Sequence, residues 1–275
     1  MEYSYNKMNE ILNKNNFQFK KKFGQNFIID FNIINSIISK SEIDKETLVL
    51  EIGPGAGSLT YQLSKKAKTV LCYEIDEKLE YILKSNLSEC NNVDIIFADF
   101  LNRDVAADIK KYKYNKLYVV ANLPYYITTP IIMKIIEEKI DVDKIVVMVQ
   151  KEVGDRFRAK PNSKDYNSLS IFLNYYYDVK KILDVSRNVF MPKPNVDSIV
   201  VEFDKKNKLE DLKNEELFFK IVRDSFKQKR KTLKNNLKKY DLEKIEKILN
   251  KHNLDLSFRA EQIGIDIFVE IANNL

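Results

Sequence analysis

The stretch "VVANLPYY" at residues 119–126 ends an apolar run with an amide, a proline and two tyrosines. An amine attached to an aromatic ring is a poor nucleophile, because its nitrogen lone pair is delocalised into the ring. The side-chain oxygen of Asn122 and the backbone carbonyl of Leu123 can accept both hydrogens of such an amine and turn its lone pair towards a methyl donor. Pro124 fixes the backbone and has no N–H that could compete for these acceptors. A following tyrosine can stack on the aromatic base that carries the amine, which contributes ~1–3 kcal/mol. These residues suit methyl transfer by positioning and hydrogen bonding.

A glycine-rich loop lies upstream, in "LEIGPGAGSLT" at residues 50–60. Gly53, Gly55 and Gly57 allow a tight turn and bring a ligand against the main chain, where a side chain would collide. The spacing G-x-G-x-G differs from the G-x-G-x-x-G of dinucleotide-binding folds, which disfavours a nicotinamide-dependent oxidoreductase. Glu51 precedes the loop, and an anion there opposes a phosphate and suits a cationic ligand.

Two further acids end the next two apolar runs. Glu74 follows Gly53 by twenty-one residues and can accept hydrogen bonds from both hydroxyls of a ribose. Asp99 can accept one from an exocyclic adenine amine. Each feature alone is more often structural, as a turn or a solvated strand end. Because the glycine loop, Glu74 and Asp99 stand at the ends of three successive predicted strands, together they favour a nucleoside without phosphates as the ligand. S-adenosylmethionine is such a ligand.

These residues are positioned by alternating strands and helices. Short β-branched runs predict strands at 47–53, 69–76, 93–99, 116–123 and 144–150. Amphipathic stretches predict helices at about 58–66, 77–87, 103–111, 129–139 and 151–159. Nearly continuous apolar strands separated by helices of crossover length indicate an α/β fold with a parallel sheet covered on both faces. Two later runs, "SLSIFLNYYYDVKKILDV" and "DSIVVEF", predict a further helix and strand in the same sheet.

The pattern changes near residue 205, where a helical region begins. We expect a cofactor-binding catalytic domain at 1–204, with a basic N-terminal arm at 1–29, and a small helical RNA-binding domain at 205–275. Residues 205–275 hold 17 Lys+Arg against 12 Asp+Glu, whereas residues 1–204 hold 29 against 28. The segment "FKQKRKTLKNNLKK" carries seven basic residues over about four predicted helical turns. Such a run is usually a solvated face, but its place in a separate domain favours contacts with RNA phosphates.

Histidine and cysteine are scarce. The only histidine, His252, lies in a polar segment, so we expect neither a Ser/His/Asp triad nor a histidine-rich metal site. Cys72 and Cys90 form no CxxC pair and are expected to be buried thiols. No apolar run approaches the ~20 residues needed to cross a bilayer, and the N-terminus does not read as a secretion signal. We expect a cytoplasmic monomer with no metal and no membrane partner.

From Lys21 onward, the sequence resembles the S-adenosylmethionine-dependent ribosomal RNA adenine dimethyltransferases, and within them the bacterial small-subunit branch. Eight motifs occur in the family's order: "KKFGQNFIID", "EIGPGAGSLT", "YEID", "FADF", "NLPYYITTPI", "FMPKPNVDS", "FKQKRKTLKNNL" and "RAEQIGID". The resemblance implies a Rossmann-like class I methyltransferase sheet with a small C-terminal α-helical domain. It also implies transfer of two methyl groups to each of two adjacent adenosines in a hairpin near the 3′ end of 16S ribosomal RNA, with the small ribosomal subunit as partner and a role in its assembly.

The resemblance also assigns residues. The cofactor positions it implies are Asn26, Ile28, Gly53, Glu74, Asp99 and Asn122, and the catalytic positions are Asn122, Leu123, Pro124 and Tyr125. Asn122 would hold the target amine and Tyr125 would stack on the target base. The family usually has leucine where this chain has Ile28. Lys20, Lys21 and Lys22 are expected to contact RNA phosphates, while Gln25 and Asn26 fold over the cofactor.

Two alternatives within RNA biology stay open at this point. The first is the sister enzyme that methylates one adenosine of large-subunit (23S) ribosomal RNA and confers macrolide resistance. It shares the cofactor motifs, but the two C-terminal motifs resemble the small-subunit branch. The second is an assembly factor that binds RNA and has lost catalysis, against which the intact sequence from Asn122 to Tyr125 argues.

Overall fold

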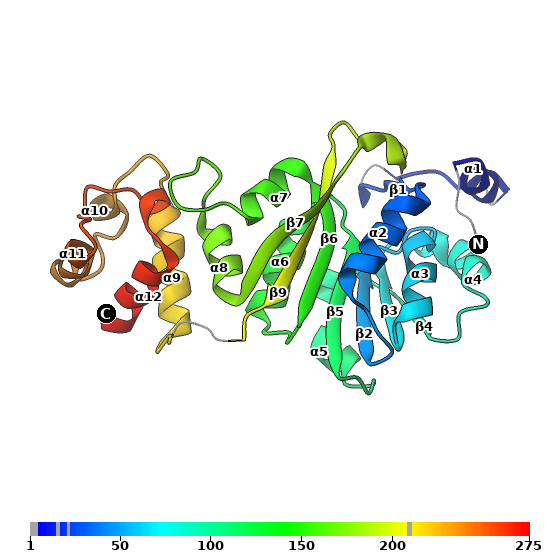
Figure 1. The fold of residues 1–275 in the computed structure, drawn as a ribbon, viewed down its shortest axis with the longest axis horizontal. Coiled ribbons are helices and arrows are strands. Elements are labelled where there is room, and N and C mark those ends of the chain that lie inside the picture. The colour runs from blue at the N-terminus through cyan, green and yellow to red at the C-terminus, as the bar shows by residue number, and fades with distance from the viewer. Residues whose placement is uncertain (1–4, 15–16, 21–22, 208–210) are drawn as a thin grey trace. The chain divides into compact units, whose positions relative to one another are not determined.

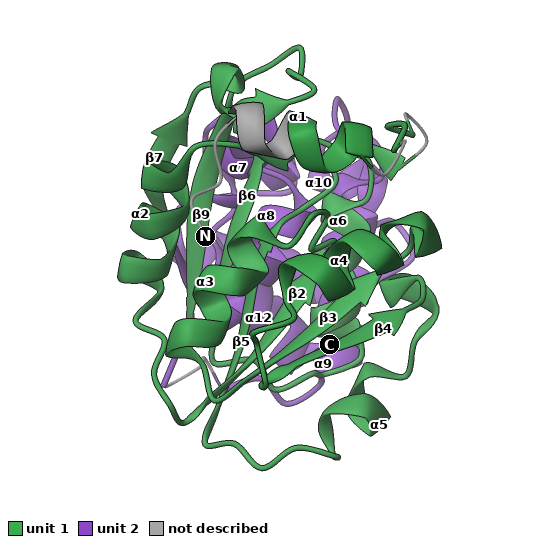
Figure 2. Ribbon diagram, turned by 90° about the vertical axis from the view of Figure 1, so that its right-hand side faces the viewer, with its two compact units in different colours: residues 1–151, 180–204 green, residues 152–179, 205–275 purple. Residues whose placement is uncertain are grey.

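The structure is a computed structural model that describes residues 5–14, 17–20, 23–207 and 211–275 (Figure 1). It divides into two compact units, which are coloured separately in Figure 2. Unit 1 comprises residues 1–151 and 180–204, and unit 2 comprises residues 152–179 and 205–275. No helix among the described residues is both long enough and apolar enough to span a membrane.

Unit 1 contains the strands and helices predicted between residues 45 and 150. In chain order its elements are α1 (Tyr5–Lys14), β1 (Phe27–Ile28), α2 (Phe31–Ser41), β2 (Thr47–Ile52), α3 (Ser58–Lys66), β3 (Thr69–Glu74), η2 (Glu77–Leu79), α4 (Glu80–Asn86), β4 (Val93–Phe97), η3 (Phe100–Asn102), α5 (Val105–Ile109), β5 (Lys116–Asn122), α6 (Thr128–Glu137) and β6 (Lys144–Gln150). The second part of unit 1 holds most of β7 (Tyr177–Val185), then η4 (Arg187–Val189), β8 (Phe190–Met191) and β9 (Ser198–Lys205). The first three residues of β7 and the last residue of β9 belong to unit 2.

The strands form one seven-stranded sheet and one small sheet. The large sheet has the order β4-β3-β2-β5-β6-β9-β7, and β1 pairs with β8 in the small one. Strands β4, β3, β2, β5 and β6 run parallel, whereas β9 is antiparallel to β6. The parallel sheet is therefore confirmed, and so is the later strand that joins it. Chain order reverses between β2 and β5, which is the point where open α/β sheets bind ligands, outside the carboxyl ends of the strands.

The central strands are long apolar runs, which is why they occupy the middle of the sheet. All six residues of β2 are buried, and Val49, Val70 and Val120 lie in one core cluster with side chains of α2 and α3. Helices α2 and α3 therefore cover one face of the sheet. This core holds the carboxyl ends of β2, β3 and β5 at one edge, where the sequence places the glycine loop, Glu74 and Asn122.

Unit 2 is helical and includes a segment that the sequence assigned to the first domain. Its elements are α7 (Lys151–Phe157), whose first residue belongs to unit 1, α8 (Ser168–Tyr176), α9 (Glu215–Phe226), α10 (Leu233–Asn236), α11 (Leu242–Lys251), η5 (Ala260–Gln262) and α12 (Ile265–Asn274). The predicted division at residue 204 differs from the structure for residues 152–179. The reason is aromatic packing: the ring of Phe172 in α8 lies 4.5 Å from that of Phe219 in α9, centroid to centroid. Segment 152–179 holds four basic and four acidic residues, so the positive excess stays with unit 2.

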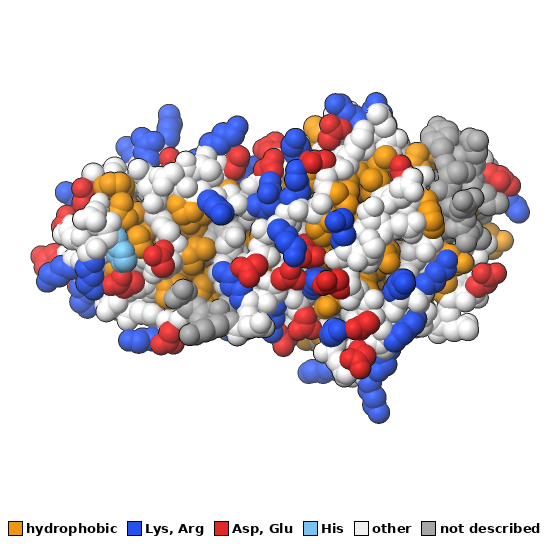
Figure 3. Space-filling model, in the orientation of Figure 1, with side chains coloured by type: hydrophobic (Ala, Val, Ile, Leu, Met, Phe, Trp, Pro, Cys, Tyr) orange, Lys and Arg blue, Asp and Glu red, His pale blue; other side chains and the backbone are white. Residues whose placement is uncertain are grey.

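The basic run of unit 2 does not form the continuous helical face that the sequence predicted. Helix α9 ends at Phe226, a turn follows, and α10 spans only four residues. Lys239 pairs with Asp224 at 2.7 Å, and the Nζ of Lys229 donates to the carbonyl of Lys164 at 2.7 Å. Figure 3 shows Lys and Arg interspersed with Asp and Glu over the visible face, so the net charge of +6 forms no single basic patch there.

Candidate active site

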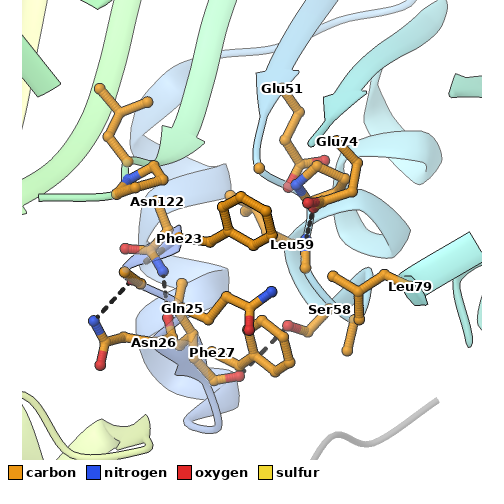
Figure 4. Close-up of a pocket in the computed structure, with 18 of the residues that line it drawn as sticks. Phe23, Gln25, Asn26, Phe27, Glu51, Ser58, Leu59, Glu74, Leu79 and Asn122 are labelled. Carbon is orange, nitrogen blue, oxygen red and sulfur yellow. Dashed lines mark hydrogen bonds between the residues drawn. The ribbon is translucent and has the colours of Figure 1, made fainter. Parts of the chain in front are cut away.

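A cleft opens at the carboxyl edge of the parallel strands in unit 1. Its empty space, including the part open to solvent, is about 680 Å³. The predicted cofactor and catalytic positions that line it are Asn26, Ile28, Gly53, Glu74, Asn122, Leu123, Pro124 and Tyr125, and Gln25, Glu51 and Gly55 line it as well. Other lining residues include Phe23, Ser58, Leu59, Ile75 and Leu79, which the sequence did not single out. Figure 4 shows Phe23 between Asn122 and Glu74 in that view.

The glycine loop forms one wall of the cleft because its backbone adopts conformations that are unfavourable for residues with a Cβ atom. Gly53 has φ +74° and Gly55 has φ +60°, in the left-handed region where glycine carries no steric cost. The N–H of Gly53 donates to the carbonyl of Tyr73 at 2.9 Å. A Cβ on Gly55 would lie 2.8 Å from the ring of Phe27. The close neighbour of this glycine is thus the ring of Phe27, and the approach of a ligand to the loop stays a prediction.

Two buried carboxylates face this loop. Glu74, the last residue of β3, is 4% exposed and accepts hydrogen bonds from the N–H groups of Gly55 at 3.2 Å and Asp76 at 2.9 Å. Burial raises the pKa of Glu74 to about 7, although these N–H groups oppose the shift. Glu51 is 1% exposed, and burial, with a smaller contribution from Glu74, raises its pKa to about 8. Such a pair favours a cationic ligand, which would stabilise the ionised carboxylates.

Asn122 ends β5 with its amide held in one orientation. Its Nδ2 donates to the backbone carbonyl of Asn26 at 2.8 Å (Figure 4), so Oδ1 is the end left to accept a hydrogen bond from a ligand. The N–H of Leu123 donates to the carbonyl of Met148 on β6 at 3.1 Å. The carbonyl of Pro124 accepts from Ile127 N–H at 3.2 Å. The residues after β5 are thus fixed both to the neighbouring strand and within their own turn.

The two tyrosines after Pro124 differ in environment. Tyr125 lines the cleft, and its hydroxyl oxygen lies 2.7 Å from the Oγ of Ser198. Tyr126 is 53% exposed and is not among the residues that line the cleft. The position of Tyr125 is the one that suits stacking on a base held at Asn122.

The N-terminal segment closes the opposite side of the cleft. The rings of Phe17, Phe19 and Phe27 pack together, with centroids 5.2–6.0 Å apart. The Nζ of Lys20 donates to Oδ1 of Asp76 at 2.6 Å, and its contact with RNA phosphates stays a prediction. Lys21 and Lys22 lie outside the described residues.

With this geometry established, the sequence comparisons decide the family. The family described as ribosomal RNA adenine dimethylase matches residues 16–275. The chain belongs to this family. A ribosomal RNA small subunit methyltransferase A from Bacillus mycoides (strain KBAB4) is 45% identical over 279 residues, covering 98% of this chain and 96% of the relative. Its counterpart from Bacillus pumilus (strain SAFR-032) is 46% identical over 275 residues, covering 97% and 94%.

Solved structures confirm the fold of this dimethylase. A dimethyladenosine transferase from Plasmodium falciparum superposes with a TM-score of 0.74 at 24% identity, over 89% of this chain and 95% of that one. The 23S rRNA methyltransferase ErmE superposes with a TM-score of 0.70 at 23% identity, over 90% and 99%. The predicted α/β, Rossmann-like methyltransferase fold is therefore confirmed.

The cofactor of the dimethylase is S-adenosylmethionine, and the cleft fits it. This molecule supplies an electrophilic methyl group on a sulfonium, and it also carries an ammonium. The buried carboxylates of Glu51 and Glu74, when ionised, are complementary to these positive charges. Glu74 can also accept hydrogen bonds from the two hydroxyls of the ribose, and the backbone of the glycine loop can contact the ligand directly. Ile28 lines the cleft from β1, where it pairs with Phe190, so isoleucine occupies the expected position.

Among the six predicted cofactor positions, Asp99 is the one that does not line the cleft. It caps η3, and its side chain accepts hydrogen bonds from Leu101 N–H at 2.9 Å and from Asn102 Nδ2 at 3.0 Å. Its contact with a cofactor amine stays a prediction. Among the residues that the sequence missed, Ser58 lies in the motif at residues 51–60 but was given no role, and it begins α3. Leu79 belongs to no motif and reaches the cleft from η2.

Proposed function

We propose that this dimethylase transfers two methyl groups from S-adenosylmethionine to the N6 of each of two adjacent adenosines near the 3′ end of 16S ribosomal RNA. The observation that carries the proposal is the orientation of Asn122. Because its Nδ2 is bound to the carbonyl of Asn26, its Oδ1 is the acceptor available in the cleft that also holds Glu51 and Glu74.

The proposed roles of the residues follow from their chemistry. Oδ1 of Asn122 and the carbonyl of Leu123 accept the two hydrogens of the adenine amine and hold its lone pair towards the methyl group. Pro124 keeps the backbone in the required turn and offers no competing N–H. Tyr125 stacks on the base after it leaves its own stack, a step that costs a few kcal/mol.

The choice of substrate is supported by the relatives and by the charge distribution. The relatives that cover almost the whole chain are small subunit methyltransferases by name. Unit 2 carries most of the positive excess, so we propose that it contacts RNA phosphates and that binding weakens steeply with salt. We further propose that the protein acts as a monomer in the cytoplasm, on small ribosomal subunits, and contributes to their assembly.

Tritiated S-adenosylmethionine tests the reaction. The protein is mixed with small ribosomal subunits that lack the modification, and the RNA is digested to identify the labelled nucleoside. We expect dimethyladenosine from the wild type and none from Asn122→Ala. The control is Asn115→Ala, an exposed asparagine just before the other end of β5, which should methylate normally. Label on large-subunit RNA alone would instead support the alternative resistance enzyme, and no label on either RNA would refute methylation.

A further inference from the structure

Ser198 has no part in the function described so far, yet its side chain contacts Tyr125, which lines the cleft. It is the first residue of β9 and ends the motif "FMPKPNVDS". The side chain is 1% exposed, and its Oγ lies 2.7 Å from the hydroxyl oxygen of Tyr125. The two residues are 73 positions apart in the chain, so tertiary structure alone creates this contact.

Ser198 is a rigid partner because the backbone around it is fixed. It pairs with Gln150 in the ladder between β9 and β6. The carbonyl of the preceding residue, Asp197, accepts from Lys151 N–H at 3.1 Å, and the Asp197 carboxylate accepts from Arg187 N–H at 3.0 Å. The backbone that carries the Ser198 side chain is thus fixed both at Ser198 and at the residue before it.

A hydrogen bond at the tip of Tyr125 restricts where its ring can lie. The phenol oxygen is the atom farthest from the backbone, so holding it fixes the direction in which the ring projects from its Cα. Burial raises the pKa of Tyr125, so the hydroxyl stays protonated at neutral pH and the hydrogen bond persists. Without a partner at this point the ring could turn among its rotamers.

We propose that Ser198 is a positioning residue that holds the Tyr125 ring in the orientation required to stack on the target adenine. The proposal rests on the proposed function and adds to it a residue that acts through Tyr125. A merely structural hydrogen bond would stabilise the fold but leave the stacking of the base unchanged, and this difference makes the two roles separable.

The test is a double-mutant cycle with Ser198→Ala, Tyr125→Phe and the combined variant. The first readout is kcat for methylation. We expect each single variant to lower it by about 3- to 10-fold, in the range of one neutral hydrogen bond, and the double variant to be no worse than the poorer single one. The KM for S-adenosylmethionine should not change, because neither hydroxyl belongs to the proposed cofactor contacts.

The second readout needs no cofactor. An RNA hairpin with 2-aminopurine at the target position reports stacking by quenching of its fluorescence. We expect the three variants to share the same reduced quenching relative to the wild type. The matched control is Ser225→Ala, which removes another serine that is 1% exposed and donates to the carbonyl of Ile221 at 2.8 Å. It should lower the free energy of unfolding without changing either readout.

The outcomes separate this inference from the proposed function. A wild type that methylates adenosine, with losses that simply add in the double variant, overturns the role of Ser198 and leaves the reaction standing. Unchanged kcat and quenching in Ser198→Ala overturn it as well. A wild type that methylates no adenosine refutes the proposed function itself.

Discussion

The contact between Lys20 and Asp76 is expected to control how tightly the cleft holds its cofactor. Asp76 lies just after β3 and is 1% exposed. Its Oδ1 accepts from Lys20 Nζ at 2.6 Å and its Oδ2 from Gln25 Nε2 at 2.9 Å. Burial alone would raise the pKa of Asp76, but the hydrogen bonds from Lys20, Gln25 and the Lys78 N–H, together with the charge of Lys20, lower the pKa below its ordinary value. The carboxylate therefore ties the segment that carries cleft residues 23–28 to the end of β3.

The perturbation is Lys20→Met, which keeps the four-atom apolar stem of the side chain and removes the ammonium. A hydrogen bond to a charged group contributes ~1.5–3 kcal/mol when it is well shielded. Lys20 is 28% exposed, so the lower end applies, and about 1.5 kcal/mol corresponds to roughly tenfold in an equilibrium constant. Because cofactor binding requires this segment in place, we expect the Kd for S-adenosylmethionine to rise by about tenfold, as measured by isothermal titration calorimetry.

The matched control is Lys84→Met. Lys84 pairs with Glu80 at the same distance, 2.6 Å, but the two side chains are 70% and 49% exposed and lie on α4. Such pairs contribute about 0.3–0.5 kcal/mol, and this one should leave cofactor affinity unchanged. If Lys20→Met bound S-adenosylmethionine as tightly as the wild type, the segment would not need this ion pair to close the cleft. The depressed pKa of Asp76 means that its stabilising contribution is lost only at acid pH, as the carboxylate protonates below its ordinary value of 3.8.

Two further predictions concern the stability of the cofactor-free protein. Because burial raises the pKa of Glu51 to about 8 and of Glu74 to about 7, from an ordinary 4.5, the folded state binds more protons than the unfolded state between these values. The free energy of unfolding should therefore fall as pH rises from about 4.5 to about 8, by on the order of 5 kcal/mol for Glu51 and about 3 kcal/mol for Glu74. Urea unfolding at several pH values should show a much flatter profile when both are replaced by glutamine. Gly55→Ala should destabilise the protein more than Gly53→Ala in thermal unfolding: both incur the ~1–2 kcal/mol of a positive φ, but only at Gly55 would the new Cβ lie 2.8 Å from Phe27, whereas at Gly53 the nearest atom is 3.8 Å away. Equal losses would contradict the role of that ring as a packed wall.

The strands and much of the site could be predicted from the sequence because their signals are local. A buried parallel strand needs a continuous apolar run, and the runs at 47–53 and 116–123 each match a strand to within about one residue. Residues directly after such runs must lie at the carboxyl edge of the sheet, which is why Glu74 and Asn122 were found. Their placement follows from chain direction alone.

The remaining features depend on contacts between distant segments. The aromatic face of α8 reads equally well as packing on a sheet or on a helix, and only the presence of α9 decides it, so the boundary at 204 missed residues 152–179. Lys20 looked like part of a basic arm, because its charge is visible in the sequence and its partner Asp76 is not. Burial of an acid beside a lysine cannot be inferred from a spacing of 56 residues.

These distant contacts share one physical logic. The parallel core supplies the reacting and binding groups at its strand ends, but each group is oriented by a segment outside that core. Asn122 is oriented by the carbonyl of Asn26, Tyr125 contacts Ser198 of β9, and the end of β3 is joined to the N-terminal segment through Asp76. In a fold of this type the sheet can stay folded while the site loses its geometry. Removing a flanking contact leaves the groups at the strand ends present but no longer oriented. Variants of the flanking residues should therefore lower affinity or kcat while the strands stay folded, whereas loss of core side chains should unfold the protein.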